Sequence, residues 1–259
     1  MVTAPFFQRL TLLIGGKAAA ALQNSRVIVF GLGGVGSWCA EALVRSGIGR
    51  ITLVDSDVVC PSNINRQLQA CSSSIGRLKT AALEERLADI NPDCRISSFP
   101  QVFSKETSGM FGIPGADYVI DAIDSLTHKL NLIETAMNAG TRLFSSMGMA
   151  QKLDPTLIKS DDIWKTSGCA LARLVRQGLR KRGFRGHFTA VYSPEQIPRQ
   201  NPPEPAPAAS GVPGMTGAWD GGKKVINGTV VTVTATAGLV LAGLVVQDVY
   251  KRCGGVPVE

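Results

Sequence analysis

The stretch 31–57, GLGGVGSWCAEALVRSGIGRITLVDSD, contains residues whose types and spacing can bind a nucleotide. Its first glycines follow an apolar run and open a helical pattern, a setting in which backbone N–H groups receive phosphate. They are Gly31, Gly33, Gly34 and Gly36. Nineteen residues after Gly36, Asp55 ends the next apolar run, where its carboxylate can accept hydrogen bonds from ribose hydroxyls. NAD and ATP both satisfy this pattern, because each carries linked phosphates and a ribose.

The stretch 61–69, PSNINRQLQ, together with Lys79, favours ATP over NAD. Hydride transfer needs no pair of cations beside the phosphates. Cleavage of ATP between its α and β phosphates releases pyrophosphate with growing negative charge, which positioned cations and a metal ion stabilise. Arg66 can grip phosphate oxygens bidentately, and Lys79 supplies a second positive charge. The alternative for either residue is a solvated surface charge.

Short apolar runs alternate with helical patterns along the first half of the chain. Buried parallel strands have this continuous apolar character. The runs lie at 26–31, 50–55, 95–99, 118–124 and 141–147. Helices are expected from about Ser37 to Ser46 and from Arg77 to Asn91, where a proline follows. The pattern predicts an α/β fold: a doubly wound, Rossmann-like, mostly parallel sheet with a smaller substrate-side α+β part.

The second half of the chain changes in composition. Residues 1–150 are expected to form the ATP-binding core, and residues 151–224 a basic substrate-side region. In that region we expect a hairpin around KLDPTLIKSDD, a basic helix near residues 164–182, and a loop rich in Pro, Gly and Ala that includes residues 194–215.

Residues 225–259 are expected to form a C-terminal strand and helix that pack back on the core. The β-branched run GTVVTVT at 228–234 is typical of a strand, and the residues after it of a helix. Residues 225–247 carry no charge, so a membrane span is the alternative. The change of pattern favours the strand and buried helix, and we expect no membrane span.

Charge and cysteine usage narrow the class of protein. The 259 residues carry a formal net charge of +7, which favours an anionic partner, nucleic acid first and a membrane surface second. The six cysteines form no C-x-x-C pair, so neither a thiolate zinc site nor a redox pair is indicated. The first thirty residues lack a secretory pattern, and the expected location is cytoplasmic.

Several of these motifs together resemble the ubiquitin-activating-enzyme-like (ThiF/MoeB-type) adenylating superfamily. The motifs are G-x-G-G-V-G, the D-x-D of Asp55 and Asp57, N-x-N-R-Q at 63–67, Lys79, and DAID at 121–124. Members of this superfamily activate a carboxylate as an acyl adenylate. The sulfur-carrier activators among them commonly hold zinc with two C-x-x-C pairs, which this chain lacks.

The closer resemblance is to the tRNA threonylcarbamoyladenosine dehydratases. It covers roughly residues 6–193 and 225–252, and it includes IGRLK, YVIDAIDSLTHK and SSMGMAQKLDPT. The pair KLDPT and DIWKT is what points to this branch.

The resemblance implies a role for each matching residue. Asp55 would bind ribose, Asn63, Arg66 and Lys79 the phosphates, and Asp124 would ligate Mg²⁺. Asp57 and Gln67 belong to the same nucleotide-binding motifs, and Arg9 is the counterpart of an N-terminal arginine that reaches a neighbouring subunit's nucleotide in relatives. The implied catalytic residues are Arg66, Lys79 and Asp124. The alternative for Asp124 is a helix N-cap.

The resemblance also implies the reaction and the partners. The carboxylate of threonylcarbamoyladenosine attacks the α-phosphate of ATP, and ring closure then expels AMP with net loss of water. No protein nucleophile is needed for an intramolecular closure, so we expect Cys169 to be a structural thiol. A homodimer and, more remotely, a sulfur-transfer partner are suggested by relatives alone.

A basic stretch indicates how tRNA is bound. No acidic residue lies between Asp162 and Glu195, and the many cations there suit RNA phosphates. The expected RNA-binding residues are Arg173, Arg176, Arg180, Lys181, Arg182 and Arg185. A solvated basic helix is the alternative reading of this stretch.

Two other function classes stay open at this point. One is an adenylating activator of a ubiquitin-like or sulfur-carrier protein, which the shared superfamily motifs would also serve. The other is an NAD enzyme or a catalytically silent nucleotide-binding scaffold.

Overall fold

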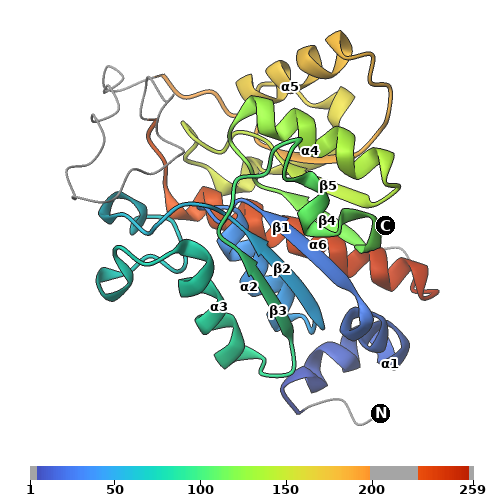
Figure 1. Cartoon of the computed structure of the whole chain (residues 1–259). Helices are drawn as coiled ribbons and strands as arrows, with labels where there is room; N and C mark the ends of the chain where they lie inside the picture. Colours follow the sequence, from blue (N-terminus) through green and yellow to red (C-terminus); the bar gives the residue numbers. More distant parts are fainter. Residues whose placement is uncertain (1–4, 199–226, 257–259) are drawn as a thin grey trace.

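The computed structural model describes residues 5–198 and 227–256, and residues 1–4, 199–226 and 257–259 lie outside the described part. A seven-stranded sheet with the order β3-β2-β1-β4-β5-β7-β6 forms the centre of the described chain (Figure 1). The strands are β1 (Arg26–Phe30), β2 (Arg50–Val54), β3 (Arg95–Phe99), β4 (Tyr118–Asp121), β5 (Arg142–Ser146), β6 (Lys159–Asp162) and β7 (Thr189–Tyr192). All neighbours pair in parallel except β6 and β7.

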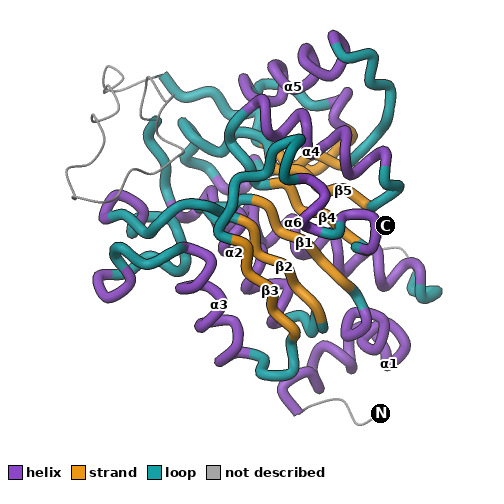
Figure 2. The backbone as a smooth tube through the Cα atoms, viewed as in Figure 1, coloured by secondary structure: helices purple, strands orange, loops and turns teal. Residues whose placement is uncertain are grey.

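Helices cover both faces of the sheet (Figure 2). The helices are α1 (Gln8–Asn24), α2 (Gly36–Arg45), α3 (Lys79–Ile90), α4 (Leu126–Asn138), α5 (Ala170–Lys181) and α6 (Val231–Arg252). One apolar core joins the sheet to α2, α3 and α6, and a second joins it to α4 and α5. The predicted doubly wound, mostly parallel α/β fold is therefore confirmed.

Burial on both faces explains the continuous apolar runs. In β1, Val27, Ile28, Val29 and Phe30 are all fully buried, so consecutive side chains meet apolar surroundings on opposite faces. β1 lies between β2 and β4, and the chain order reverses there. Ligands of doubly wound sheets bind at this switch point, outside the carboxyl ends of the strands.

The strand expected over 228–234 is wrong, because α6 already begins at Val231. Val233 and Thr234 are buried, and a Cβ on Gly238 would lie only 2.4 Å from the Val35 carbonyl oxygen at the start of α2. This close packing of α6 along α2 outweighs a strand preference of at most ~1 kcal/mol per residue. α6 is long and apolar enough to cross a membrane by length and composition, and 39% of its most apolar window is buried against the protein.

The hairpin expected around KLDPTLIKSDD is also wrong. β6 pairs with β7, about thirty residues later, rather than with an adjacent strand. The basic helix is shorter than expected and begins at Ala170, because Ile163–Lys165 forms a separate 3₁₀ turn.

The helix α1 has no counterpart among the sequence expectations. The division into residues 1–150, 151–224 and 225–259 stays a prediction, and most of the Pro-rich loop lies outside the described residues.

Candidate active site at the carboxyl ends of β1, β2 and β4

The glycine turn after β1 has two positions that only glycine can occupy. Gly31 has φ +86°, a left-handed conformation, and its missing Cβ would lie 2.7 Å from the Ala122 carbonyl oxygen. A Cβ on Gly36 would lie 1.8 Å from the Gly31 carbonyl oxygen. A Cβ on Gly33 would meet nothing within 4 Å. The turn is therefore closely packed on its inner side and open at Gly33, where a phosphate can approach.

Asp55 ties the end of β2 to this turn. Its Oδ2 accepts a 2.6 Å hydrogen bond from the backbone N–H of Leu32, and its Oδ1 accepts a 2.9 Å bond from the N–H of Asp57. The carboxylate is buried. Asp55 thus lies beside the glycine turn, where a carboxylate can meet the ribose of a nucleotide bound there.

Lys79 opens α3 and lies against the same carboxylates. Its Nζ is 2.7 Å from Asp57 Oδ2 and 4.0 Å from Asp55 Oδ1. Burial by itself would lower the pKa of Lys79, but Asp55 and Asp57 together outweigh burial and raise the pKa above its ordinary value. The ammonium therefore stays charged beside the glycine turn.

Arg66 approaches the turn from the loop after β2. Its backbone oxygen accepts a 3.0 Å hydrogen bond from Trp38 Nε1 of α2, and its Nη1 donates to the carbonyl oxygen of Ser62 at 2.8 Å. A Cβ on Gly34 would lie 3.1 Å from Arg66 Cγ, so the side chain passes over the turn. Burial lowers the pKa of Arg66 and the charge of Asp124 acts against this, which indicates that the two groups interact.

Asn63 and Gln67 are both buried in this loop. Asn63 Oδ1 accepts a 3.1 Å hydrogen bond from the Cys60 N–H, so this amide shapes the loop. The buried Gln67 Oε1 lacks a hydrogen-bond partner within the described residues. An orphaned buried acceptor is uncommon, and it fits a position that a bound molecule completes.

Asp124 is exposed in the turn between β4 and α4. The N-cap of α4 is Ser125 rather than Asp124, so the capping alternative does not describe this helix. Within residues 5–198 and 227–256, no group of three or more His, Cys, Asp and Glu side chains is arranged to hold a metal. A carboxylate at this place suits a hard cation that takes its other ligands from phosphate and water.

Sequence reasoning missed a buried ion pair beneath Asp124. Lys129 Nζ lies 2.7 Å from Asp121 Oδ2, and both side chains are fully buried. Ser145 Oγ donates to the same Asp121 oxygen at 2.6 Å, while Asp121 Oδ1 accepts a 3.0 Å bond from the Ile123 N–H. The pair therefore fixes the turn that ends in Asp124. A lysine followed by Leu130, Leu132 and Ile133 is the only sequence signal for it.

Among the nucleotide-site candidates, Arg9 is the one that lies elsewhere in the structure. It is exposed in the first turn of α1, next to Phe7, which packs at Gly47 in the turn leading into β2. This is the amino-terminal edge of the sheet, opposite the glycine turn (Figure 1). A role for Arg9 in a neighbouring subunit stays a prediction.

The basic residues expected to bind RNA divide into two groups. Arg173, Arg180, Lys181 and Arg185 are exposed, and the Arg180 guanidinium lies 5.3 Å from the Trp164 ring centroid. The other two are held by protein partners: the half-buried Arg176 donates to Thr166 Oγ1, and Nη1 of the exposed Arg182 donates to Glu134 Oε2 at 2.7 Å. Cys169 is buried at the N-cap of α5, with its Sγ donating to the Gly148 carbonyl oxygen at 3.8 Å.

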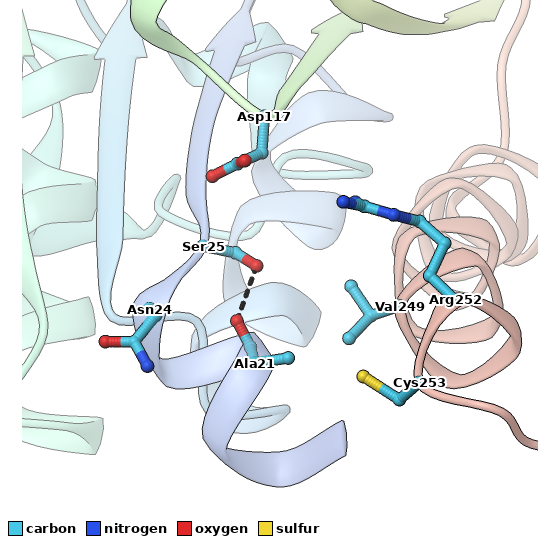
Figure 3. Close-up of a pocket in the computed structure, with 7 residues that line it drawn as sticks. All are labelled: Ala21, Asn24, Ser25, Asp117, Val249, Arg252 and Cys253. Atoms are coloured by element: carbon cyan, nitrogen blue, oxygen red, sulfur yellow. Dashed lines mark hydrogen bonds between the residues drawn. The ribbon is translucent and has the colours of Figure 1, made fainter. Parts of the chain in front are cut away.

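A cavity of about 270 Å³ lies at the opposite edge of the sheet (Figure 3). Ser25 and Asp117, which precede β1 and β4, face Arg252 and Cys253 at the end of α6 across it. Asp117 Oδ2 already accepts a 2.8 Å hydrogen bond from the Arg26 N–H, and Ser25 Oγ donates to the Ala21 carbonyl oxygen at 2.7 Å. This cavity is separate from the nucleotide site.

Comparison with known proteins agrees with the geometry. The profile of the ThiF family matches residues 7–259. The chain belongs to the ThiF family. Within this family, it is 44% identical over 189 residues to the tRNA threonylcarbamoyladenosine dehydratase of Bacillus subtilis, covering 73% of this chain and 74% of that protein. It therefore belongs to the branch of the tRNA threonylcarbamoyladenosine dehydratases.

Two further ThiF-family comparisons involve the Escherichia coli dehydratase. The sequences are 39% identical over 168 residues, which span 65% of this chain and 63% of the relative. The structure of E. coli TcdA in complex with ATP superimposes with a TM-score of 0.81 at 30% identity and covers 98% of both chains. The likeness in fold thus extends well beyond the segment that the sequence comparison aligns.

Proposed function

We propose that this ThiF-family chain cyclises threonylcarbamoyladenosine in tRNA, with ATP as the activating substrate. The observation that carries the proposal is the meeting of Arg66, Lys79 and Asp124 around one open glycine turn. Two cations and an exposed carboxylate serve the cleavage of a triphosphate, whereas hydride transfer from NAD has no use for them. The relatives named as tRNA threonylcarbamoyladenosine dehydratases support the choice of substrate.

The proposed reaction has two steps. First, a carboxylate oxygen of the threonylcarbamoyl group attacks the α-phosphorus of ATP, the bond from that phosphorus to the bridging oxygen breaks, and pyrophosphate leaves. Second, a nucleophilic group of the same modification attacks the activated carbonyl carbon, loses its proton, and expels AMP. One carboxylate oxygen leaves with AMP and the attacking group loses its proton, so the tRNA loses the elements of water.

Each residue of the site has a role in the first step. Asp55 holds the ribose, the open side of the turn at Gly33 receives phosphate, and Arg66 and Lys79 stabilise the charge that grows on pyrophosphate. Asp124 would hold Mg²⁺, which would supply Lewis-acid polarisation of the phosphates. The second step is intramolecular, so proximity replaces a protein nucleophile. This role assignment leaves Cys169 structural, in keeping with its burial.

The tRNA is proposed to lie across α5. The exposed Arg173, Arg180, Lys181 and Arg185 are free of acidic neighbours in the sequence and can neutralise phosphates. Arg176 and Arg182 are each fixed by a protein partner, so they have fewer free hydrogen-bond donors for the RNA than the other four cations.

A homodimer and a cytoplasmic location complete the proposal. On α1, Leu12 and Leu13 are 80% and 78% exposed, an apolar surface that supports association with a second copy. Such a dimer is what would bring Arg9 to the partner's nucleotide. The sulfur-transfer partner rests on resemblance alone.

The decisive experiment incubates the protein with ATP, Mg²⁺ and tRNA that carries threonylcarbamoyladenosine, followed by mass spectrometry of the anticodon-loop nucleosides. The expected result is a nucleoside lighter by one water, formed together with AMP and pyrophosphate. Pyrophosphate release with a Gly-Gly-ended carrier protein and not with tRNA would instead identify an activator of that carrier. Release with neither substrate would leave a nucleotide-binding scaffold.

A further inference from the structure

A second cavity lies on the α4 and α5 side of the sheet. Its volume is about 600 Å³, within the range of sites that hold small organic ligands. Its walls come from the segment after β3, from one face of α4, and from the residues that follow α5. The side chains that matter here are Lys105, Asn131, Asn138, Arg182 and Phe184.

The cavity is built to hold a positive charge in place. Arg182 Nη1 donates to Asn131 Oδ1 at 2.9 Å and to Glu134 Oε2 at 2.7 Å, so the guanidinium is fixed at the wall. The negative charge of Glu134 balances the positive charge of Arg182, and the exposed Lys105 adds a second positive charge to the lining. The lining thus carries one net positive charge. The remaining N–H groups of the Arg182 guanidinium and the Lys105 ammonium can still donate hydrogen bonds to a ligand.

The other lining groups suit a nucleobase. Phe184 is partly buried and packs edge-on against Phe188, with ring centroids 6.5 Å apart, which gives it a defined orientation. Asn131 and Asn138 contribute side-chain amides from α4. Aromatic rings and amides are what single-stranded RNA bases stack on and pair with when they are splayed out of a helix.

The cavity lies along α4 from the turn that contains Asp124. Asp124 lies just before α4, and Asn131 and Asn138 follow it by seven and fourteen residues. At a rise of about 1.5 Å per residue, these amides lie ~10 and ~20 Å along α4 from the metal-binding turn. At this separation, one bound RNA could reach both places, and the nucleotide in the cavity would be a different one from the reacting adenosine.

We propose that this cavity binds a flanking nucleotide of the tRNA, with its phosphate on Lys105 and Arg182 and its base beside Phe184. The inference rests on the proposed action on tRNA and adds to it a second contact point. Two contacts, one at the reacting adenosine and one in the cavity, would set the direction in which the RNA strand runs across α4.

Salt titration of tRNA binding tests the phosphate contact. In Lys105→Gln, the slope of log affinity against log salt should fall by up to about 0.7, the value for one single-strand phosphate contact. Lys17→Gln on the exposed part of α1 is the matched control and should keep the wild-type slope. ATP affinity should be unchanged in both. An unchanged slope and affinity in Lys105→Gln would overturn the proposal.

Phe184→Leu tests the base contact with little change in side-chain volume. tRNA affinity should fall by about tenfold or more, as it does when one stacked base is deprived of its aromatic partner. An unchanged melting temperature and ATP affinity separate this result from misfolding. Wild-type affinity in a folded Phe184→Leu variant contradicts a base at this place.

Two further measurements separate the possible failures. Titration of AMP into ATP-saturated protein should show no second site; a second AMP that Lys105→Gln abolishes would assign the cavity to free nucleotide and overturn the proposal. If wild-type protein binds tRNA with Lys105-dependent salt sensitivity but never converts threonylcarbamoyladenosine, the cavity assignment stands and the proposed reaction fails.

Discussion

Lys129 Nζ and Asp121 Oδ2 lie 2.7 Å apart in a place where neither side chain has any exposed surface. The same ammonium donates to the Ser146 carbonyl oxygen at 2.9 Å. The pair therefore joins α4 to the carboxyl ends of β4 and β5, directly beneath the turn that ends in Asp124. Both charges are satisfied only while the three elements keep their relative positions.

Removing one member of this pair should be strongly destabilising. Lys129→Met leaves Asp121 buried without its counter-charge, and the free energy of unfolding should fall by about 3–5 kcal/mol. Urea denaturation gives the value. The control is Arg77→Gln, which breaks the exposed Arg77–Glu85 pair and should cost at most ~1 kcal/mol. An equal decrease in the free energy of unfolding for the two variants would show that the buried pair contributes no more to stability than the exposed pair.

Arg66 and Asp124 should be needed for turnover rather than for folding. Arg66→Ala removes a cation that stabilises the leaving pyrophosphate, and Asp124→Ala removes the carboxylate proposed to hold Mg²⁺. In each variant turnover should fall by about a hundredfold or more. Pyrophosphate release under saturating ATP and modified tRNA measures the effect. Arg77→Ala, an exposed arginine on the same stretch of chain, should keep its activity. Near wild-type turnover in either site variant would remove that residue from the mechanism.

The glycine turn offers a matched pair of alanine substitutions. In Gly36→Ala the added Cβ would lie 1.8 Å from the Gly31 carbonyl oxygen, so the protein should lose at least about 1–3 kcal/mol of stability. In Gly33→Ala the Cβ meets nothing within 4 Å, and stability should hardly change. ATP affinity of Gly33→Ala should nevertheless fall by about tenfold, because the methyl group takes space that phosphate needs. Calorimetry and thermal melts measure both; an unaltered ATP affinity would place the phosphates elsewhere.

Cysteine alkylation should depend on pH in a position-specific way. Hydrogen bonding with Ser73 and Ser74 lowers the pKa of the exposed Cys71 thiol to about 7, whereas burial raises the pKa of Cys94 to about 11. The thiolate replaces the thiol as the pH rises through the pKa, so alkylation of Cys71 should rise with pH, reach half of its maximum rate near pH 7 and level off at higher pH. Ser73→Ala should move this midpoint upward. Peptide mass spectrometry after brief iodoacetamide treatment reads each site, and equal rates at Cys71 and Cys94 near neutral pH would contradict the expectation.

The exposed cations of α5 and of the loop that follows it should set the salt dependence of tRNA binding. Replacing Arg173, Lys181 and Arg185 by Gln should lower the slope of log affinity against log salt by up to ~0.7–0.9 for each phosphate that is no longer neutralised. ATP affinity should stay the same. The charge-matched control replaces Lys17, Arg50 and Lys251, which are exposed on other elements. Equal slopes in the two triple variants would move the RNA-binding face away from α5.

The nucleotide-binding half of the molecule could be predicted from sequence because its determinants are local. Gly31, Gly36 and Asp55 each lie at the end of a buried strand or the start of a helix, and parallel strands bring their carboxyl ends to one edge. Arg66 and Lys79 follow in the same segment, so chain connectivity alone keeps them near. The family resemblance added their roles, which spacing does not supply.

The tertiary structure decided what depends on distant partners. Residues 231–234 have the composition of a strand, but the close contact of Gly238 with Val35 makes them the first turn of α6. From the sequence, Lys129 would be read as a surface cation, but in the structure it is buried against Asp121 and Ser145. Arg182 would be read as one of a row of free cations, but it forms an ion pair with Glu134. Local preference is worth at most about 1 kcal/mol per residue, whereas leaving a buried charge unpaired costs several times more. Such packing and pairing are properties of the assembled sheet and helices. Gly238 and Val35 lie far apart in the chain, and Asp121 and Lys129, although only eight residues apart, meet because β4 and α4 pack together.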